Sequence, residues 1–321
     1  MCELAAIARR IGIQVADTFW LPVVNHQAVF YGSHFDLLDD RWLKKPLHIG
    51  MAYFHGKPGT GVPEFDQSYR RLCQVHHRIH RVQVSHKEME EVVLDSGIKQ
   101  EKVFLIPIGI NLTYFPLQTP ESRRNARAKL NIPQSAVVVG SFQKDGVGWG
   151  EGMEPKFIKG PDVFLKTIQL LQHHIPELFI LLSGPARGYV KAGLERLGVP
   201  YCHVFLKDYP EMGQLFQALD IYIISSRQEG GPKAVLETMA SGVPLVTTRV
   251  GQAMDLVRHG ENGWMVDIDD VEALAYWAEY VVSHRSILEA VLRTSRQTAE
   301  VNSYEAQIPL WDRFMRGFVE W

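Results

Sequence analysis

The chain has 321 residues, of which 46% are hydrophobic and 22% charged, and its formal net charge is −2. This composition is typical of a globular protein and excludes collagen-like, low-complexity and intrinsically disordered classes. At about 100 to 200 residues per domain, the length predicts two domains.

The cysteines and the apolar segments indicate the cellular compartment. Cys2, Cys73 and Cys202 lie far apart without a C-x-x-C spacing, which argues against a disulfide framework and against a zinc site. No apolar run reaches the roughly 18 residues that a membrane-spanning helix needs, and residues 1–3 do not open a signal peptide. We therefore expect a cytoplasmic protein.

The charges are distributed unevenly along the chain. Residues 1–130 carry 17 Lys and Arg against 13 Asp and Glu, which leaves 17 against 23 for the remainder. A basic N-terminal part is compatible with peripheral contact to the inner face of a membrane or with a phosphorylated acceptor, although a solvated surface is the commoner explanation. We expect no nucleic-acid partner.

The first predicted element is an amphipathic helix over residues 3–11, which ends at Gly12. Because an α/β chain usually opens with a strand, we expect the first domain to lack its opening strand. A long polar helix is predicted to run to about Ile79. Short apolar segments bounded by polar or turn residues predict buried parallel strands at residues 13–16, 28–31, 48–54, 81–85 and 104–108.

From residue 137 onward, strands and helices alternate regularly. The polar, proline-containing segment 117–125 precedes this region and predicts an interdomain link, which divides the chain into domains 1–120 and 121–303. The alternation predicts a doubly wound parallel sheet of the Rossmann-like kind. Its strands are expected at residues 137–142, 178–183, 203–206, 221–225 and 245–248, and its helices at residues 161–173, 190–197, 211–219 and 232–240.

The segment after the predicted strand 221–225 is the most informative motif. In a doubly wound sheet, ligands bind beyond the carboxyl ends of the strands, and the backbone N–H groups of Gly230 and Gly231 stand there before a helix that opens on Pro232. Glu229 and Glu237 could accept paired hydrogen bonds from sugar hydroxyls of one elongated ligand. The alternative is that Glu229 merely complements the helix dipole and that Glu237 is an exposed acid.

The stretch 229–237 resembles the E-x7-E signature of the retaining GT-B glycosyltransferases, the glycosyl transferase group 1 family (glycosyltransferase family four-like). The resemblance covers residues 135–285 closely and residues 80–115 more weakly. It implies a GT-B fold, with two Rossmann-like doubly wound domains facing a cleft and a C-terminal helix, 304–321, packed back on the first domain. The motifs that follow the family's order are Lys159-Gly160, Ser183-Gly184-Pro185, residues 219–223, residues 239–244 and residues 260–264.

The resemblance also implies roles for individual residues. Glu229 and the amides of Gly230 and Gly231 would hold the donor sugar beside Pro232, and Glu237 would bind the ribose hydroxyls. Lys159, which precedes a helix starting at Pro161, would neutralise the diphosphate, although an exposed structural lysine is the alternative. The family's arginine is replaced by Ser141, so Lys144 is the nearest substitute cation. Gly184 and Leu206, at two further strand ends, complete the expected donor-binding set.

Three histidines and one glycine-rich loop carry further hypotheses. His55 resembles the family's strand-end histidine that faces the donor sugar, but one loop histidine among 13 is unremarkable. His76 and His80 would share a helical face, as metal ligands can, yet no third ligand is suitably spaced, so we expect no metal. Residues 146–152 fail the G-x-G-x-x-G spacing and are interpreted as an inserted flexible loop that closes over donor or acceptor.

The resemblance implies a metal-independent hexosyltransferase that retains anomeric configuration. It would move a sugar from a UDP- or GDP-linked donor to an acceptor hydroxyl of a glycan, glycolipid or small molecule, without a cofactor. The leaving diphosphate would take the acceptor's proton while Lys159 and backbone amides stabilise its charge. Two alternatives stay open: a nucleotide-sugar epimerase or hydrolase on the same fold, and a non-catalytic sugar-nucleotide-binding subunit.

Overall fold

The computed structural model describes residues 2–16 and 28–319, which form two compact units. One unit contains the chain up to Gly109 together with the residues from Asn302 on, and the other is Ile110–Val301. The division therefore lies about ten residues before the boundary expected near residue 120. It lies there because Ile110 and Phe115 are buried in the core of the second unit.

The first unit contains a four-stranded parallel sheet in the order β1-β2-β3-β4. The connections between its strands are η2 (His34–Leu38), α2 (Pro63–Val75), η3 (His76–Arg78), α3 (Lys87–Asp95) and η4 (Gln100–Lys102). The strands are β1 (Ala28–Tyr31), β2 (His48–Tyr53), β3 (Ile79–Val84) and β4 (Val103–Leu105).

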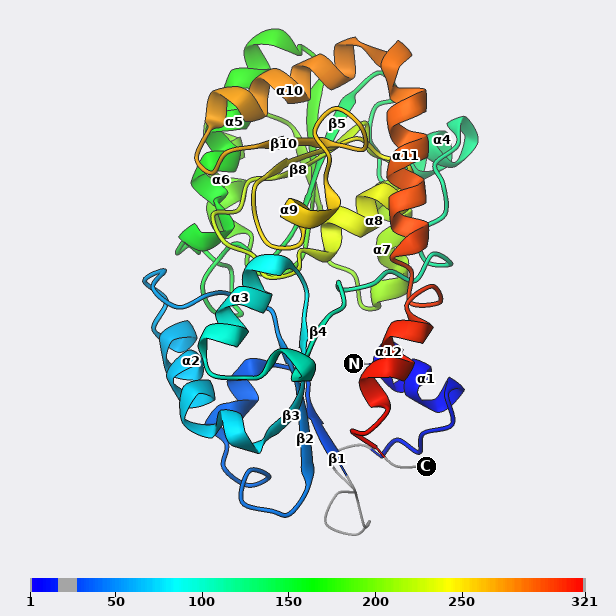
Figure 1. Ribbon diagram of the computed structural model, residues 1–321. Helices are drawn as coiled ribbons and strands as arrows, with labels where there is room; N and C mark the ends of the chain where they lie inside the picture. Colours follow the sequence, from blue (N-terminus) through cyan, green and yellow to red (C-terminus); the bar gives the residue numbers. More distant parts are fainter. Residues whose placement is uncertain (1, 17–27, 320–321) are drawn as a thin grey trace. The chain divides into compact units, whose positions relative to one another are not determined.

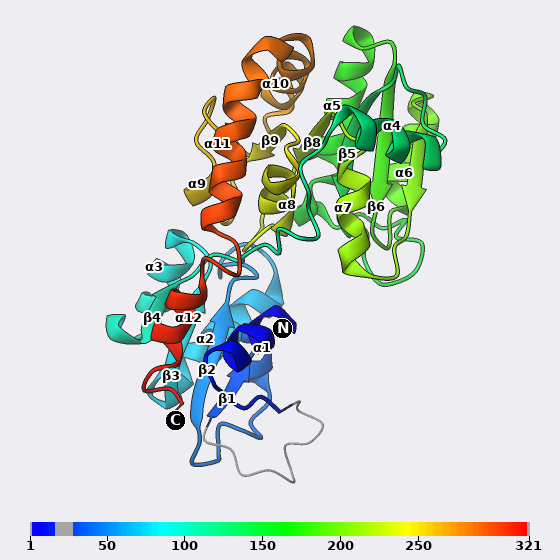
Figure 2. The same ribbon diagram turned by 90° about the vertical axis from the view of Figure 1, so that its right-hand side faces the viewer.

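Each face of this sheet is buried against helices. Leu72 of α2 and Met89 of α3 belong to the core that includes Met51 and Val82. On the other face, α1 (Cys2–Arg10) and α12 (Ile308–Met315) come from opposite ends of the chain and lie side by side (Figures 1 and 2). Their apolar side chains pack on Phe30 and Phe104, and are those of Ile7, Ala8, Trp311 and Phe314. The layers of the unit are thus helix, sheet and helix.

Two expectations for the first unit are wrong. Residues 13–16 form no strand: Ile13 donates its N–H to the carbonyl of Ala8 at 2.9 Å and ends α1, and its side chain is buried among α1 and α12. His76 and His80 do not share a helical face, because α2 ends at Val75 and His80 lies in β3, where its Nδ1 accepts a hydrogen bond from Ile49. Short apolar segments suit a strand and a helix end equally well.

The second unit contains a six-stranded parallel sheet in the order β10-β9-β8-β5-β6-β7. Its strands are β5 (Val137–Phe142), β6 (Leu178–Ser183), β7 (Tyr201–Val204), β8 (Ile221–Ile224), β9 (Leu245–Thr248) and β10 (Trp264–Val266). Its helices are α4 (Pro120–Lys129), η5 (Phe157–Lys159), α5 (Pro161–His174), α6 (Gly188–Leu197), η6 (Tyr209–Glu211), α7 (Met212–Phe216), α8 (Lys233–Ser241), α9 (Ala253–Leu256), α10 (Val271–Ser283), η7 (Arg285–Ile287) and α11 (Leu288–Val301).

Helices cover both faces of this sheet, which confirms the Rossmann-like prediction. Helix α10 lies beside α5 over one face, and α11 lies beside α8 over the other (Figure 1). The strand order reverses at β5, which pairs with β6 on one side and with β8 on the other. The crevice outside the carboxyl ends of β5 and β8 is therefore the expected ligand position. No helix of the described residues has the length and apolar character to cross a membrane.

Candidate functional site

Lys159 and Glu229 meet at the carboxyl ends of β5 and β8. The Nζ of Lys159 lies 2.5 Å from Oε2 of Glu229, and the Oγ of Ser226 donates to the other carboxylate oxygen at 2.9 Å. Their side chains retain 23% and 13% of their exposure. The sequence motif therefore corresponds to a partly buried ion pair rather than to two isolated surface charges.

The backbone fixes Lys159 in this position. Gly160 has φ 61°, and a Cβ on it would lie only 1.9 Å from the carbonyl oxygen of Ser225, so no other residue fits there. The Oγ of Ser225 donates to the carbonyl of Gly160 at 2.9 Å, and the N–H of Arg227 donates to Ile158 at 2.9 Å. Residues 157–160 are thereby held against the end of β8, beside the N-terminus of α5.

The glycines after Glu229 lead directly into α8, whose N-cap is Pro232. The carbonyl of Gly230 accepts a hydrogen bond from the N–H of Gln252 at 2.9 Å. A Cβ on Gly251 would lie 2.3 Å from that carbonyl oxygen, so the loop after β9 packs tightly on the Gly230 backbone. Gly230 is buried and Gly231 is partly exposed. This packing fixes the loop that carries Glu229 relative to the helix that carries Glu237.

Glu237 is not an exposed acid, so that alternative is wrong: its residue exposure is 6%. The hydroxyl of Tyr209 donates to its Oε1 at 2.6 Å. Burial raises the pKa of Glu237, while the Tyr209 hydrogen bond and the charge of Lys233 oppose that rise. Lys233 itself stands 4.6 Å from the centroid of the Tyr209 ring. A carboxylate is thus kept in a largely dry place with one hydrogen bond already made.

Ser141 contacts a buried arginine, Arg187, that sequence reasoning missed. The guanidinium of Arg187 donates to the carbonyls of Ser141 and Ser183 at 2.5 and 2.8 Å, and to the Oγ of Ser141 at 3.2 Å. Its Nε forms an ion pair with Oδ1 of Asp145 at 3.0 Å, and neither side chain is more than 1% exposed. Burial lowers the pKa of Arg187 and raises that of Asp145, and each charge opposes the other's shift.

The pair Arg187–Asp145 ties the ends of β5 and β6 together. The one signal in the sequence was a charged residue following the Ser183-Gly184-Pro185 strand end, where the pattern alone does not show burial. Gly184 has φ 97° and accepts a hydrogen bond from Nε2 of His203 at 2.8 Å. Leu206 packs partly buried against the main core cluster of the unit.

Lys144 is paired with an aromatic ring. Its Nζ lies 3.7 Å from the centroid of Trp149, whose residue exposure is 83%. The base of the glycine-rich loop is ordered by backbone hydrogen bonds, including Lys156 to Asp145 at 2.7 Å and Gly188 to Glu151 at 2.7 Å. The second of these caps the N-terminus of α6, so the inserted loop is anchored even though its tip is exposed.

His55 belongs to the first unit, where it follows β2 and is exposed. It stacks on Phe35, with ring centroids 5.1 Å apart, and meets His34 edge-on at 5.3 Å. His34 is fully buried, and that burial, followed by the charge of His55, lowers its pKa to about 3. Among the residues that the structure describes, no three or more His, Cys, Asp and Glu side chains are grouped to hold a metal ion.

Solved structures of known proteins share this architecture. The Anabaena protein HepE in complex with UDP-glucose superposes with a TM-score of 0.75 at 17% identity, over 91% of this chain and 79% of HepE. Sucrose-phosphate synthase from Thermosynechococcus elongatus also gives 0.75 at 17% identity, over 98% of this chain and 78% of the synthase. The fold is therefore the GT-B fold, as the sequence predicted.

A family model matches most of the second unit. Residues 148–283 match the family model described as glycosyl transferases group 1. The resemblance predicted from the sequence is thereby confirmed for this region.

Among curated relatives, the D-inositol 3-phosphate glycosyltransferase of Corynebacterium urealyticum is 28% identical over 76% of this chain and 57% of the relative. The lipopolysaccharide core biosynthesis mannosyltransferase LpsB of Rhizobium meliloti is 26% identical over 65% of this chain and 60% of LpsB. The chain thus spans less than two thirds of the length of these relatives.

Proposed function

We propose that the protein is a retaining glycosyltransferase that moves a sugar from a nucleotide diphosphate sugar to an acceptor hydroxyl. The observation that carries this proposal is the Lys159–Glu229 pair at the point where the strand order of the second sheet reverses. A crevice of this kind binds nucleotides in doubly wound folds. HepE was solved in complex with UDP-glucose, which supports a UDP-linked donor, and a GDP-linked donor is the alternative within the proposal.

The charges of the site fit a sugar diphosphate. Lys159 stands beside the N-terminus of α5, so an ammonium group and a helix dipole act on the same point, where a diphosphate would be held. Glu229 would accept hydrogen bonds from the sugar hydroxyls, with Gly230 and Gly231 supplying backbone N–H groups beside it. Glu237, with one oxygen bonded to Tyr209, would accept from the ribose hydroxyls.

The proposed reaction balances without a protein nucleophile. The acceptor oxygen bonds to the anomeric carbon on the face that the leaving group occupies, as the bond between that carbon and the phosphate oxygen breaks. The acceptor's proton passes to the departing phosphate oxygen. Lys159 stabilises the charge that develops there, which is worth most in a partly desolvated place such as this. The proposed reaction uses no metal or cofactor.

The test combines two site variants with product analysis. Lys159→Ala and Glu229→Ala should each lower turnover by about 100- to 1000-fold, because each removes an interaction with the reacting group. Lys166→Ala, an exposed lysine of α5, is the matched control and should keep the activity of the unchanged protein. The measurement is nucleotide diphosphate release from UDP- and GDP-sugars with a panel of sugar and lipid-linked acceptors.

NMR of the product distinguishes the proposal from its alternatives. A new glycosidic bond with the anomeric configuration of the donor supports retaining transfer. An inverted product contradicts the retaining mechanism, and an epimerised nucleotide-sugar formed without acceptor contradicts transfer itself. Nucleotide binding without turnover of any donor would leave a non-catalytic binding subunit. A cytoplasmic location and peripheral membrane contact stay predictions.

A further inference from the structure

A cavity of about 530 Å³ opens in the second unit at the amino ends of its strands. Gln134 precedes β5, Asp220 immediately precedes β8 and Pro244 immediately precedes β9, and all three line the cavity. Because the strands of the sheet are parallel, this edge is the one opposite to the carboxyl edge that carries Lys159 and Glu229. The cavity is therefore separate from the proposed donor site.

The polar side of the cavity has an excess of positive charge. Asp220 is the one acidic residue among the described residues that line it, and its carboxylate is already engaged by Arg123 at 2.7 Å and Arg127 at 2.6 Å. It also accepts the backbone N–H of Val138 at 2.8 Å. Arg285 reaches it only at 3.5 Å. One carboxylate thus faces several guanidinium groups, with both of its oxygens satisfied.

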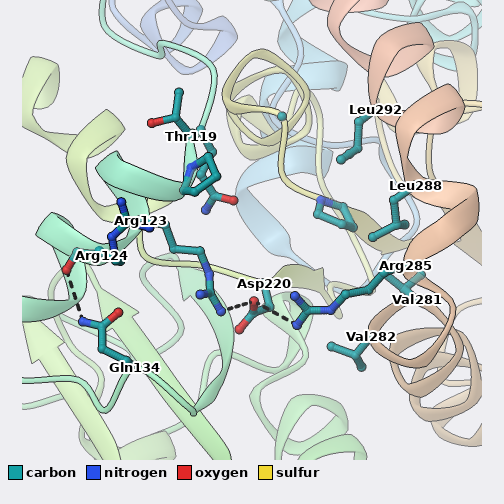
Figure 3. A pocket seen from close by; sticks show the side chains of 14 residues that line it. Thr119, Arg123, Arg124, Gln134, Asp220, Val281, Val282, Arg285, Leu288 and Leu292 are labelled. Atoms are coloured by element: carbon teal, nitrogen blue, oxygen red, sulfur yellow. Dashed lines mark hydrogen bonds and ion pairs between the residues drawn. The ribbon is translucent and has the colours of Figure 1, made fainter.

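Two arginines that line the cavity, Arg285 and Arg124, are exposed to a ligand. Arg285 keeps 63% of its side-chain exposure, and Arg124, which also lines the cavity, is exposed on α4. Figure 3 shows Arg123 and Arg285 approaching Asp220 from opposite sides of the cavity, with Arg124 beyond Arg123. The guanidinium fork suits phosphate and carboxylate oxygens, so an anion entering here would meet donors on both sides.

The other wall of the cavity is apolar. It is formed by Val282 of α10 and by Leu288 and Leu292 of α11, and Figure 3 shows these side chains on the side away from Arg124. Leu288 and Leu292 are only partly buried, so the wall is accessible within the unit. An anion alone would leave this surface in water, whereas a ligand with an apolar part would cover it.

We propose that this cavity binds a phosphate ester that carries an apolar group, with the phosphate at Arg285 and the apolar group against Leu288 and Leu292. A phospholipid and a soluble phosphate ester share this chemistry. The site is additional to the donor site and does not depend on the proposed transfer reaction. Glu121 and Glu289, the acids of the neighbouring helix starts, are exposed and do not line the cavity.

The test measures binding by calorimetry at physiological salt, where screening weakens unspecific attraction. The ligands are monomeric dihexanoyl phosphatidic acid, glycerol 3-phosphate and inorganic phosphate. The acylated ligand should bind most tightly, and Arg285→Ala should weaken its binding at least about tenfold, because a charge-assisted contact to the phosphate is lost. Arg293→Ala, an exposed arginine of α11 outside the cavity, is the matched control and should bind as the unchanged protein does.

Leu288→Ser tests the apolar wall separately. It should bring the affinity for the acylated ligand down towards that for glycerol 3-phosphate and leave the affinity for glycerol 3-phosphate unchanged. Circular dichroism checks that each variant is folded, and Leu292→Ser replaces Leu288→Ser if that variant is not. If the unchanged protein co-sediments with phosphatidate-containing vesicles and the arginine variant does not, the ligand is a membrane lipid. Binding of the monomeric ligand without co-sedimentation identifies a soluble ester.

Three results would overturn the proposal. Absence of measurable binding of all three ligands would remove the site. Binding that the arginine variant keeps would place the ligand elsewhere. Inorganic phosphate binding as tightly as the acylated ligand would show that the apolar wall takes no part.

Discussion

The carboxyl edges of the two sheets differ in their chemistry. In the second unit this edge holds charges in fixed pairs, Lys159 with Glu229 and Arg187 with Asp145. In the first unit the corresponding strand ends present aromatic and imidazole groups, with His34 buried against Tyr53 and the exposed His55 stacked on Phe35. The first edge also carries an ion pair, Lys57 with Glu88, but that pair is partly exposed. The edges therefore differ in what they bury: a charge pair in the second unit and an imidazole ring in the first.

The difference teaches how each edge remains stable. A buried ion pair depends on both partners, because removing one leaves an uncompensated charge. A buried imidazole depends on staying neutral: neither ring nitrogen of His34 has a hydrogen-bond partner among the described residues, so protonation would be strongly unfavourable. We therefore expect the stability of the second unit to fall when one charge of a pair is removed, and the stability of the first unit to fall in acid.

The largest effect is expected from Arg187→Met. The substitution leaves the Asp145 carboxylate buried and unpaired, which should lower the free energy of unfolding by about 3–5 kcal/mol in urea titrations. Arg196→Met, an exposed arginine of α6, is the control and should change stability by about 0.5 kcal/mol or less. Adding Asp145→Asn to Arg187→Met should recover part of the loss. If Arg187→Met alone were as stable as the unchanged protein, the Arg187–Asp145 pair would not hold β5 and β6 together.

A somewhat smaller effect is expected from acid on the first edge. The pKa of His34 is about 3 in the native state and about 6.5 in the unfolded state. Below pH 6.5 the unfolded state therefore binds a proton that the native state does not. The contribution of neutral His34 to the free energy of unfolding is complete above pH 6.5 and is lost as the pH falls towards 3. At pH 4 the loss amounts to about 3 kcal/mol. His34→Phe, which suits the surrounding rings, should remove that part of the pH dependence measured by urea unfolding between pH 4 and pH 7.

The control for this prediction is His77→Phe, an exposed histidine of the same unit, which should keep the original pH dependence. An unchanged slope in His34→Phe would mean that the acid sensitivity arises from other groups of the unit. The buried, neutral His34 would then not be what makes the first unit sensitive to acid.

The regular part of the fold was predictable because its signals are continuous. β5, β6 and β9 run over the predicted residues, since each opens on consecutive apolar residues and is bounded by turn or helix residues. The failures were at short segments, such as residues 13–16, and at the unit boundary, where burial of Ile110 and Phe115 decides and periodicity does not.

The site was predictable only in part. The motif placed Glu229 after the strand 221–225 and Lys159 before the helix that starts at Pro161, and the fold brings the two side chains together across 70 residues of sequence. Arg187 meets Asp145, and Tyr209 meets Glu237, through tertiary contacts that leave no periodic trace. Such pairs form where two segments distant in sequence meet in the fold. The local sequence of either segment does not show which residue it will meet.

The smallest effect is expected from Glu237→Gln, which tests whether the buried charge of this residue contributes to nucleotide binding at the carboxyl edge of the second unit. Glutamine can still accept the hydrogen bond from Tyr209 but has no charge, so we expect nucleotide affinity to fall by about tenfold, as for one charge-assisted hydrogen bond reduced to a neutral one. Because burial raises the pKa of Glu237, the affinity of the unchanged protein should decline on acidification at a higher pH than an ordinary glutamate would give. The Gln variant should lack that decline.

Glu195→Gln is the matched control, since Glu195 also accepts a tyrosine hydroxyl, that of Tyr201 at 2.7 Å, but is exposed on α6. Calorimetric titration of UDP and GDP between pH 5 and pH 8 measures both variants. If Glu237→Gln binds nucleotide as tightly as Glu195→Gln and with the same pH profile, the buried carboxylate serves only to hold Tyr209. Ribose recognition must then come from other groups of the edge.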